Sequence, residues 1–473
     1  MTNRRDFLKL GCGAFGIAAF EQGLERFGLL AHAAAATPPN PYRALVCIFM
    51  FGGNDANNMV IPVNGSGNAG YNTYAQSRGS DLAIAQGAIQ AFANALPSTG
   101  LNYGLHPSMP ELKGIFDAGD LAIVANVGPL TRWPTTKALY QSNAAYRPYQ
   151  LFSHSDQQSS WQAPRSDVKA TTGWGGLTAD NLVSLNTGTV FPTVVSLAGN
   201  SQFNVGQSTR PVIAAPAPTA LNQIFPLSGF ANNAVDNARK TAFNSLRTFD
   251  TGIPLVKATS DITQQALDIS ASLSTDPVVG TFPNTGLGNQ LKQVAKIIKL
   301  NQTSLNVSRQ VFFCSIGGFD THQNEIPSHT NLYTQISKAM KAFYDEMNAQ
   351  GLGSSVTTFT MSDFSRTMAP SGSGVTIVGS DHAWGSHQII MGGAIKTADF
   401  YGNVGPNGMA FPDLVLGSSG YDTDSRGRWI PTTAVEQYAS TLGLWLGATP
   451  AQLNTIFPNL YRFPTYDLGF LTA

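Results

Sequence analysis

Five short, largely apolar runs recur along the chain and predict the central strands of a sheet. The first reads Ala-Leu-Val-Cys-Ile-Phe-Met-Phe and is followed by a Gly-Gly pair. A run that is apolar at almost every position is typical of a strand that is buried on both faces. The predicted strands cover residues 44–51, 121–127, 190–197, 311–316 and 356–361.

Between these runs the apolar residues recur every three or four positions, which predicts helices. The clearest case is residues 332–347, where Leu332, Ile336 and Met340 share one helical face and Gly351 marks the end of the helix. Strands that alternate with helices form a mostly parallel sheet with helices on both faces. The other predicted helices cover residues 233–248, 289–300 and 435–446.

Two segments have the composition of loops. Residues 207–226 contain Ala-Pro-Ala-Pro, and residues 371–378 are rich in glycine and serine. Motifs of one kind occur on both sides of residues 200–230, and we find no internal repeat. We therefore expect residues 34–473 to form a single domain with a loop-rich insertion around 200–230.

The first residues predict export. Arg4 and Arg5 are followed by Phe-Leu, then by the apolar stretch 10–20, and finally by Ala-His-Ala before Ala34. Charged residues interrupt the apolar stretch well before it reaches the ~20 residues that span a bilayer. We expect residues 1–33 to be a twin-arginine signal that the Tat translocase recognises. The mature protein would then be periplasmic or secreted, with no membrane span.

Composition narrows the classes of partner. Charged residues make up 12% of the chain, and 28 Lys and Arg balance 28 Asp and Glu. Nucleic-acid binding depends on clustered basic residues, so we expect no nucleic-acid partner. Cys47 and Cys314 both lie in predicted strands, which favours buried thiols over a disulfide.

Aspartate and histidine residues follow the predicted strands. Ligands of parallel sheets bind beyond the carboxyl ends of the strands. An aspartate in this position is often only a helix N-cap, but several of them gathered without a cation would repel one another. Mixed Asp and His ligation suits zinc or manganese. The metal ligands that we predict are Asp55, Asp320, His322, Asp363 and His382.

The other histidines have simpler interpretations. His387 lies close to the predicted ligands in sequence, and we interpret it as a core residue or as a residue that supports a ligand. His329 is interpreted as a polar residue at the start of a helix. His106, in Gly-Leu-His-Pro, is expected to fix a loop.

The order of the motifs resembles one family across nearly the whole chain. Gly-Gly-x-Asp-x-x-Asn, Gly-Leu-His-Pro, Ser-His, Gly-Trp, Gly-Phe-Asp-Thr-His, Ser-Asp-Phe-x-Arg-Thr and Asp-His follow in turn. This order is similar to the twin-arginine-exported family known as domain of unknown function 1501, regarded as a remote branch of the alkaline phosphatase–sulfatase superfamily. The resemblance implies a three-layer α/β fold, with a mixed, mostly parallel sheet between helices. It also implies one or two divalent metal ions beside a hydroxyl nucleophile.

The resemblance also suggests a role for each site residue. Asp55 matches the superfamily's first metal aspartate, and Asp363 matches the aspartate of its Ser-Asp-His-Gly strand end. Asp320 and His322 resemble the second ligand group, which His382 completes. This chain has Phe364 where the superfamily has histidine. A second metal ion would therefore be a harder ion, magnesium or calcium, or would be absent.

The resemblance implies a nucleophile at the Ser-His pair. Ser153 would attack, with His154 beside it, and Arg366 would bind the non-bridging oxygens of an ester. The alternative is that Ser153 is an ordinary helix N-cap. The sulfatase signature, Gly-x-Ser-x-Gly and the Gly-rich phosphate loop are all absent from the sequence.

Two classes of function remain open. The first is an exported metal-dependent hydrolase of phosphate or sulfate esters, acting on a small molecule or a polysaccharide. The second is a non-catalytic exported protein for binding or assembly that retains a metal in a degenerate hydrolase fold. No motif supports a third interpretation as a peptidase or another esterase.

Overall fold

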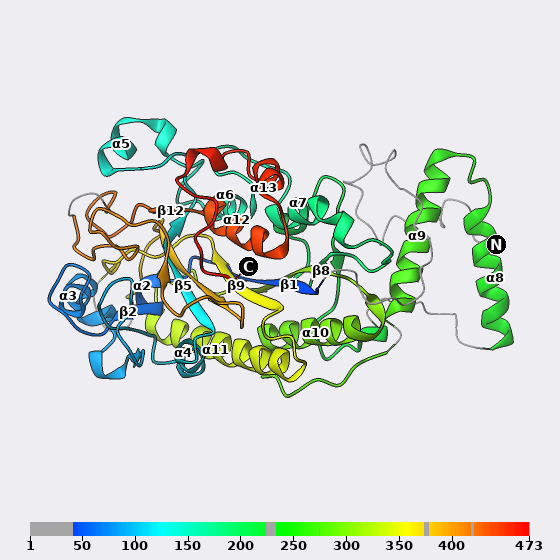
Figure 1. Ribbon diagram of the computed structural model, residues 1–473, viewed down its shortest axis with the longest axis horizontal. Helices are drawn as coiled ribbons and strands as arrows, with labels where there is room; N and C mark the ends of the chain where they lie inside the picture. Colours follow the sequence, from blue (N-terminus) through cyan, green and yellow to red (C-terminus); the bar gives the residue numbers. More distant parts are fainter. Residues whose placement is uncertain (1–40, 224–232, 274, 373–377, 418–420, 473) are drawn as a thin grey trace.

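The computed structural model describes residues 41–223, 233–273, 275–372, 378–417 and 421–472 (Figure 1). The predicted export signal lies outside these residues, and so do parts of the two predicted loops. No helix among the described residues is long and apolar enough to cross a membrane.

One large sheet forms the centre of the protein (Figure 1). Its strands are parallel to their neighbours except β10, which runs antiparallel to both β5 and β9. In sheet order the strands are β11 (Phe400–Tyr401), β5 (Leu121–Gly128), β10 (Ser386–Met391), β9 (Val356–Ser362), β1 (Arg43–Met50), β8 (Arg309–Ile316), β6 (Val194–Ser196) and β7 (Val212–Ile213). A further short strand, β12 (Thr433–Ala434), also pairs with β5. Three short strands, β2 (Val60–Pro62), β4 (Tyr103–Leu105) and β3 (Gln90–Ala91), form a second sheet.

Helices cover both faces of the large sheet. In Figure 1, α4 (Pro110–Asp117), α10 (Gly286–Leu300) and α11 (Glu325–Ala349) lie below it. Above it lie α6 (His154–Gln162), α7 (Trp174–Asn181), α12 (Val435–Leu446) and α13 (Pro450–Ile456). Side chains alternate between the faces of a strand, so β1 contributes Val46 and Ile48 to the lower core, and Leu45 and Phe49 to the upper core. The protein is therefore a three-layer α/β fold.

The hydrophobic pattern predicted five strands of the large sheet and four of the longer helices. All five predicted strands and all four predicted helices are confirmed, including α8 (Ala234–Thr248), which lies beside α9 (Pro254–Ser272) at the right of Figure 1. The strand predicted at 190–197 is shorter, because Pro192 cannot donate to the sheet. The pattern missed β10, whose first three residues are polar, and β7, which lies within a predicted loop.

Cys47 and Cys314 are both buried and free. They lie on neighbouring strands, where the register pairs Ile48 with Cys314 and Cys47 with Phe313. A shift of one residue turns a side chain to the other face of a sheet. The two thiols therefore belong to different cores, one above the sheet and one below.

This placement predicts two free thiols in a chain that lacks residues 1–33. Thiol titration of unreduced protein that has been unfolded in denaturant should give two equivalents per chain. The melting temperature should not change on addition of a reducing agent. Unreactive thiols, or a melting temperature that falls under reducing conditions, would show that a disulfide forms.

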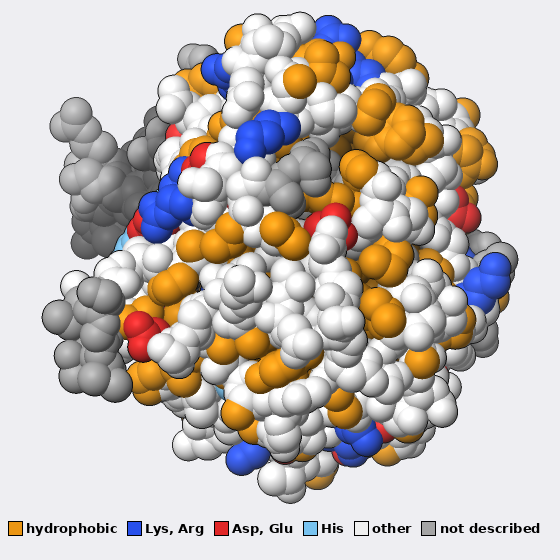
Figure 2. All heavy atoms as spheres, turned by 90° about the vertical axis from the view of Figure 1, so that its left-hand side faces the viewer, with side chains coloured by type: hydrophobic (Ala, Val, Ile, Leu, Met, Phe, Trp, Pro, Cys, Tyr) orange, Lys and Arg blue, Asp and Glu red, His pale blue; other side chains and the backbone are white. Residues whose placement is uncertain are grey.

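Charged side chains are sparse at the surface as well as in the sequence. On the face shown in Figure 2, the Lys, Arg, Asp and Glu side chains of the described residues are scattered among polar and apolar ones. The described part of that face therefore has no extended basic patch of the kind that binds nucleic acid.

Candidate metal centre

The candidate site lies where three neighbouring parallel strands end. β1 lies between β8 and β9, and the register aligns Met50 with Ile316 on one side and with Ser362 on the other. The three strands therefore finish level with one another. The segments that follow them meet at one edge of the sheet, as expected for the ligand-binding edge of a parallel sheet.

Three histidines and one aspartate gather at this edge. We call His154, Asp320, His322 and His382 the histidine cluster. The Nε2 atoms of His322 and His382 are 3.1 Å apart. The same Asp320 oxygen lies 3.2 Å from His322 Nε2 and 3.5 Å from His382 Nε2, and the other Asp320 oxygen lies 3.5 Å from His154 Nε2.

The distances among His154, Asp320 and His382 fit the ligands of one metal ion, and His322 lies outside that group of three. Bonds of about 2.0–2.1 Å from zinc to nitrogen or oxygen place neighbouring tetrahedral ligands about 3.3–3.4 Å apart. Ligand atoms of His154, Asp320 and His382 all lie within 4.8 Å of one another. The donor set, imidazole with one carboxylate, is typical of zinc and also suits manganese. The residues present therefore fit a divalent ion.

The far side of each imidazole ring is held in place. Carboxylate and carbonyl oxygens accept hydrogen bonds, so each Nδ1 is the donor and each Nε2 keeps a lone pair. Metal-binding histidines usually have such a partner, which fixes the ring and its tautomer. The three contacts are His154 Nδ1 to Asp363 at 2.7 Å, His322 Nδ1 to Asp381 at 3.2 Å, and His382 Nδ1 to the carbonyl of Phe152 at 2.8 Å.

Asp363 supports the cluster from a buried position. Its Oδ2 accepts hydrogen bonds from His154 Nδ1 and from Gln158 Nε2, the latter at 2.9 Å. Its Oδ1 is buried and has no hydrogen-bond partner among the described residues. One oxygen of Asp363 therefore orients a ligand, while the other remains free for an ion.

The local charges favour ligation by Asp320 and His382. Burial raises the pKa of Asp320, but the hydrogen bond and the charge of Arg366 lower it by more than burial raises it. The pKa of Asp320 therefore lies below its usual value. Burial, reinforced by the charge of Arg366, lowers the pKa of His382. The hydrogen bond to Asp363 raises the pKa of His154. The surroundings therefore favour the ionised form of Asp320 and the neutral form of His382, the forms that bind a metal ion.

Phe364 contacts the cluster although it cannot bind a metal ion. Its ring is stacked against His382, with centroids 4.6 Å apart, and lies 4.9 Å from the His154 ring. Gly53 gives this ring room, because a Cβ atom there would clash with Phe364. His154, the first residue of α6, thus places an imidazole beside Phe364.

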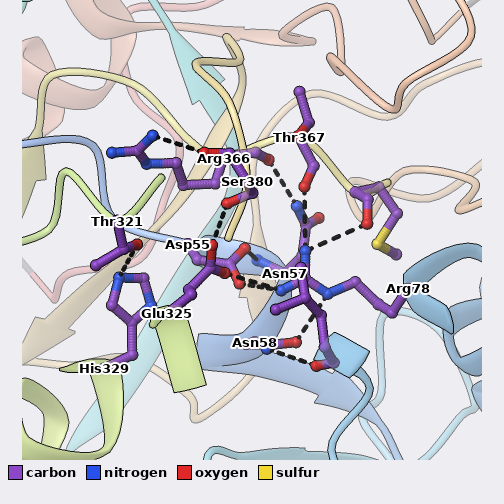
Figure 3. Close-up of polar contacts among 12 residues, drawn as sticks. Asp55, Asn57, Asn58, Arg78, Thr321, Glu325, His329, Arg366, Thr367 and Ser380 are labelled. Atoms are coloured by element: carbon purple, nitrogen blue, oxygen red, sulfur yellow. Dashed lines mark hydrogen bonds and ion pairs between the residues drawn. The ribbon is translucent and has the colours of Figure 1, made fainter. Parts of the chain in front are cut away.

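Asp55 is the one predicted ligand that the structure does not bring to the cluster. It is fully buried, caps the short helix α2 (Ala56–Met59) by accepting from the Asn57 N–H, and forms an ion pair with Arg78 (Figure 3). Burial raises the pKa of Asp55 to about 7, although Arg78 acts to lower it. The guanidinium of Arg78 therefore lies against the carboxylate of Asp55.

Of the three predicted catalytic residues, only one points into the histidine cluster. Arg366 is fully buried, and each of its three side-chain nitrogens donates to a protein oxygen; the acceptors are the carbonyls of Gly52, Gly53, Phe319 and Ser380 and the carboxylate of Asp320. It therefore ties the strand ends together instead of facing solvent. Ser153 stands at the N-cap position of α6, where its hydroxyl donates to Asp156 Oδ2 at 2.7 Å. Only His154 points into the cluster.

Several supporting residues carried little or no signal in the sequence. Phe152 acts through its backbone carbonyl, and its φ of 77° is unusual for a residue other than glycine. Asp381, next to His382, was recognisable as a neighbour but not as the partner of His322. Arg426 pairs with the free oxygen of Asp381.

The remaining histidines lie outside the cluster. His387 is a core residue, as expected: its Nδ1 accepts from the Asn126 N–H and its ring stacks on Phe411. His106 fixes a loop, also as expected, by accepting from the Ser108 N–H. His329 differs from expectation, because it is buried within α11 with its Nε2 3.0 Å from the Thr321 hydroxyl oxygen.

Comparison with solved structures returns proteins of low identity. A member of the alkaline phosphatase superfamily from Vibrio parahaemolyticus is 9% identical with a TM-score of 0.32, and the match covers 95% of this chain and 76% of that one. The periplasmic domain of EcEptC from Escherichia coli, solved with zinc, is 9% identical with a TM-score of 0.30, covering 76% and 77%. Lipoteichoic acid synthase LtaP from Listeria monocytogenes is 7% identical with a TM-score of 0.30, covering 84% and 79%. With TM-scores this low, the chemistry of this chain must be judged from its own residues.

Comparison of sequences gives a clearer result. No curated protein matches the chain. The family model described as "Protein of unknown function (DUF1501)" matches residues 42–414. That range runs from β1 past β11 and includes all four members of the histidine cluster. The chain belongs to the DUF1501 family.

Proposed function

We propose that this chain is an exported metal-dependent hydrolase of phosphate or sulfate esters, acting on a small molecule or a polysaccharide. The observation that carries the proposal is the convergence of three Nε2 atoms on the carboxylate of Asp320, with neighbouring atoms 3.1–3.5 Å apart. Zinc or manganese suits these ligands best.

The cluster is open enough to act on a substrate. The side chains of Asp320 and His322 are 49% and 46% exposed, which leaves a coordination position accessible, as in catalytic metal sites. A divalent ion held here would supply Lewis acidity to an ester oxygen or to water. Asp363 and the carbonyl of Phe152 keep His154 and His382 oriented, and Arg366 fixes Asp320.

Two partly exposed arginines beside the cluster can meet an anionic substrate. Arg426 forms an ion pair with Asp381, which in turn holds His322. Arg428 donates to the carbonyl of His382, and its guanidinium lies 4.7 Å from the centre of the Phe152 ring. Guanidinium groups are well suited to bind phosphate or sulfate oxygens.

The contacts of Ser153 favour water over this serine as the nucleophile. Its hydroxyl donates to Asp156, and within the described part of the chain no hydrogen bond joins it to the histidine cluster, whereas a serine nucleophile needs a metal ion or a base at the reacting atoms. We expect Ser153→Ala to leave the hydrolysis rate within about threefold of wild type, with a stability loss near the ~1 kcal/mol of one hydrogen bond. Steady-state kinetics and thermal unfolding of the two proteins test this. Loss of all turnover at unchanged metal content would instead identify Ser153 as the nucleophile.

The proposed activity can be tested directly. The mature protein should contain a divalent ion on elemental analysis, and it should hydrolyse nitrophenyl phosphate or nitrophenyl sulfate. A chelator should abolish the hydrolysis, and added zinc or manganese should restore it. A protein that binds metal but hydrolyses no ester on a broad substrate panel would contradict the proposal.

One observation favours the alternative, a non-catalytic metal-containing protein for binding or assembly. Arg366, the residue predicted to bind ester oxygens, is buried with all three nitrogens engaged by protein oxygens. If the protein is of this kind, removal of the metal should lower its free energy of unfolding, and the metal-loaded protein should hydrolyse no ester.

A further inference from the structure

A second group of potential metal ligands lies close to the histidine cluster and is completely enclosed. Asp55, Glu325 and His329 each offer a ligand atom, and these atoms lie within 4.8 Å of one another. All three side chains are buried (Figure 3). The Nδ1 of His329 is buried and has no hydrogen-bond partner among the described residues. Two carboxylates and an imidazole are a common donor set for a divalent ion.

A guanidinium already lies between the two carboxylates of this pocket. Arg78 Nη2 contacts Asp55 Oδ2 and lies 3.2 Å from Glu325 Oε1, and none of the three side chains is exposed (Figure 3). Arg78 Nε donates to Asn58 at 3.1 Å. A buried ion without a partner costs several kcal/mol, so two carboxylates here require a cation. Arg78 provides one from within the chain.

The pocket also holds the segments that carry the histidine cluster. Arg78 Nη1 donates to the carbonyls of Thr367 and Met368, just beyond Asp363. The Ser380 hydroxyl, two residues before His382, donates to Glu325. The Thr321 hydroxyl oxygen lies 3.0 Å from His329 Nε2, and Thr321 separates Asp320 from His322. The segments that carry Asp320, His322, Asp363 and His382 are thus anchored to one buried network.

We propose that Arg78 is a permanent cation in a pocket built like a second metal site. The chain therefore holds one exchangeable divalent ion, at the histidine cluster, and none at Asp55. The count of one at the cluster rests on the function proposed above, whereas the role of Arg78 rests only on the buried pocket. Removing the guanidinium should leave Asp55, Glu325 and His329 free to bind a divalent ion.

Metal stoichiometry tests this proposal. Metal-free protein is equilibrated with zinc, dialysed, and measured by elemental analysis. Wild type should hold one ion per chain, Arg78→Ala two, and the double variant Arg78→Ala with Asp55→Asn one. The matched control is Arg309→Ala, because Arg309 is also buried but donates only to backbone carbonyls, so its removal should create no metal site.

The outcomes separate this proposal from the proposed function. Zero ions in wild type and one in Arg78→Ala would mean that the histidine cluster fails as a metal site, while the role of Arg78 stands. Two ions in wild type would overturn the role of Arg78. Equal counts in wild type and in folded Arg78→Ala would overturn it as well.

A variant that does not fold by itself remains informative. Arg78→Ala would then be refolded with zinc, with manganese, or with millimolar guanidinium ion, and its circular dichroism compared with that of Arg78→Lys. Recovery with any of these cations supports the proposal, because the pocket then requires a cation and not the arginine itself. Failure to recover under all three conditions would overturn it.

Discussion

Replacing His382 with alanine should reduce the affinity of the protein for zinc by about 100-fold or more. Loss of a residue that only supports a ligand already costs 10–100-fold, and His382 Nε2 lies within 3.5 Å of both His322 Nε2 and Asp320. Ester hydrolysis should disappear at zinc concentrations that saturate the wild type. Titration of metal-free protein against a zinc indicator measures the affinity.

The matched control is Asp345→Ala. Asp345 is 55% exposed and pairs with Lys341 on the surface of α11, so the variant should bind zinc as the wild type does. Asp320→Ala should weaken binding at least as much as His382→Ala, because Asp320 is the carboxylate on which all three imidazoles converge. Unchanged zinc affinity in both cluster variants would show that the cluster holds no metal.

Replacing Glu436 with glutamine should stabilise the protein at neutral pH. Glu436 lies buried in the first turn of α12, where Oε1 accepts from the Ser166 N–H and Oε2 has no hydrogen-bond partner among the described residues. Burial raises its pKa from 4.5 to about 7. The folded state thus favours the protonated form, and wild type loses stability as pH rises from about 4.5 to about 7. Glutamine stays neutral, so its advantage should grow over that range by up to about 3 kcal/mol, at 1.36 kcal/mol per pKa unit.

Denaturant unfolding at several pH values between 4.5 and 8 measures the difference between the two proteins. Asp167→Asn is a control of opposite sign. Burial raises the pKa of Asp167, but hydrogen bonds from Arg165 and Arg462 lower it well below its usual value. The stability that the ionised Asp167 contributes is lost only in acid. The free energy of unfolding of Asp167→Asn should therefore lie below that of wild type by a constant amount from pH 5 to 8. A Glu436→Gln difference that is equally flat would mean that Glu436 is ionised in the fold at all these pH values.

The sequence determined where the site would be. Short, largely apolar runs predicted the strands β1, β8 and β9, because such runs are typical of strands that are buried on both faces. The polar residues that follow parallel strands must then meet at one edge of the sheet. For this reason the hydrophobic pattern predicts that Asp320, His322 and Asp363 lie together, whereas His382, which follows the Gly/Ser-rich segment, was assigned to the site by the family resemblance. The tertiary structure brings all four together.

The sequence could not decide which atoms each residue would face. The direction of β10 has no local signal, since an apolar strand has the same pattern in either direction. The carbonyl of Phe152 cannot be recognised as a partner for His382 either, because every residue has a carbonyl. Its role depends on the backbone conformation just before α6, where Phe152 takes a positive φ.

The pairing of Asp55 was decided by tertiary structure alone. The residue follows a buried strand just as Asp320 does, so the sequence treats the two aspartates alike. What separates them is Arg78, which lies in α3 (Tyr71–Leu82), a helix with no apolar face to predict its packing. Packing brings that guanidinium against Asp55 and Glu325, where exclusion of water makes the ion pair strong. Asp320, by contrast, remains half exposed beside three imidazoles.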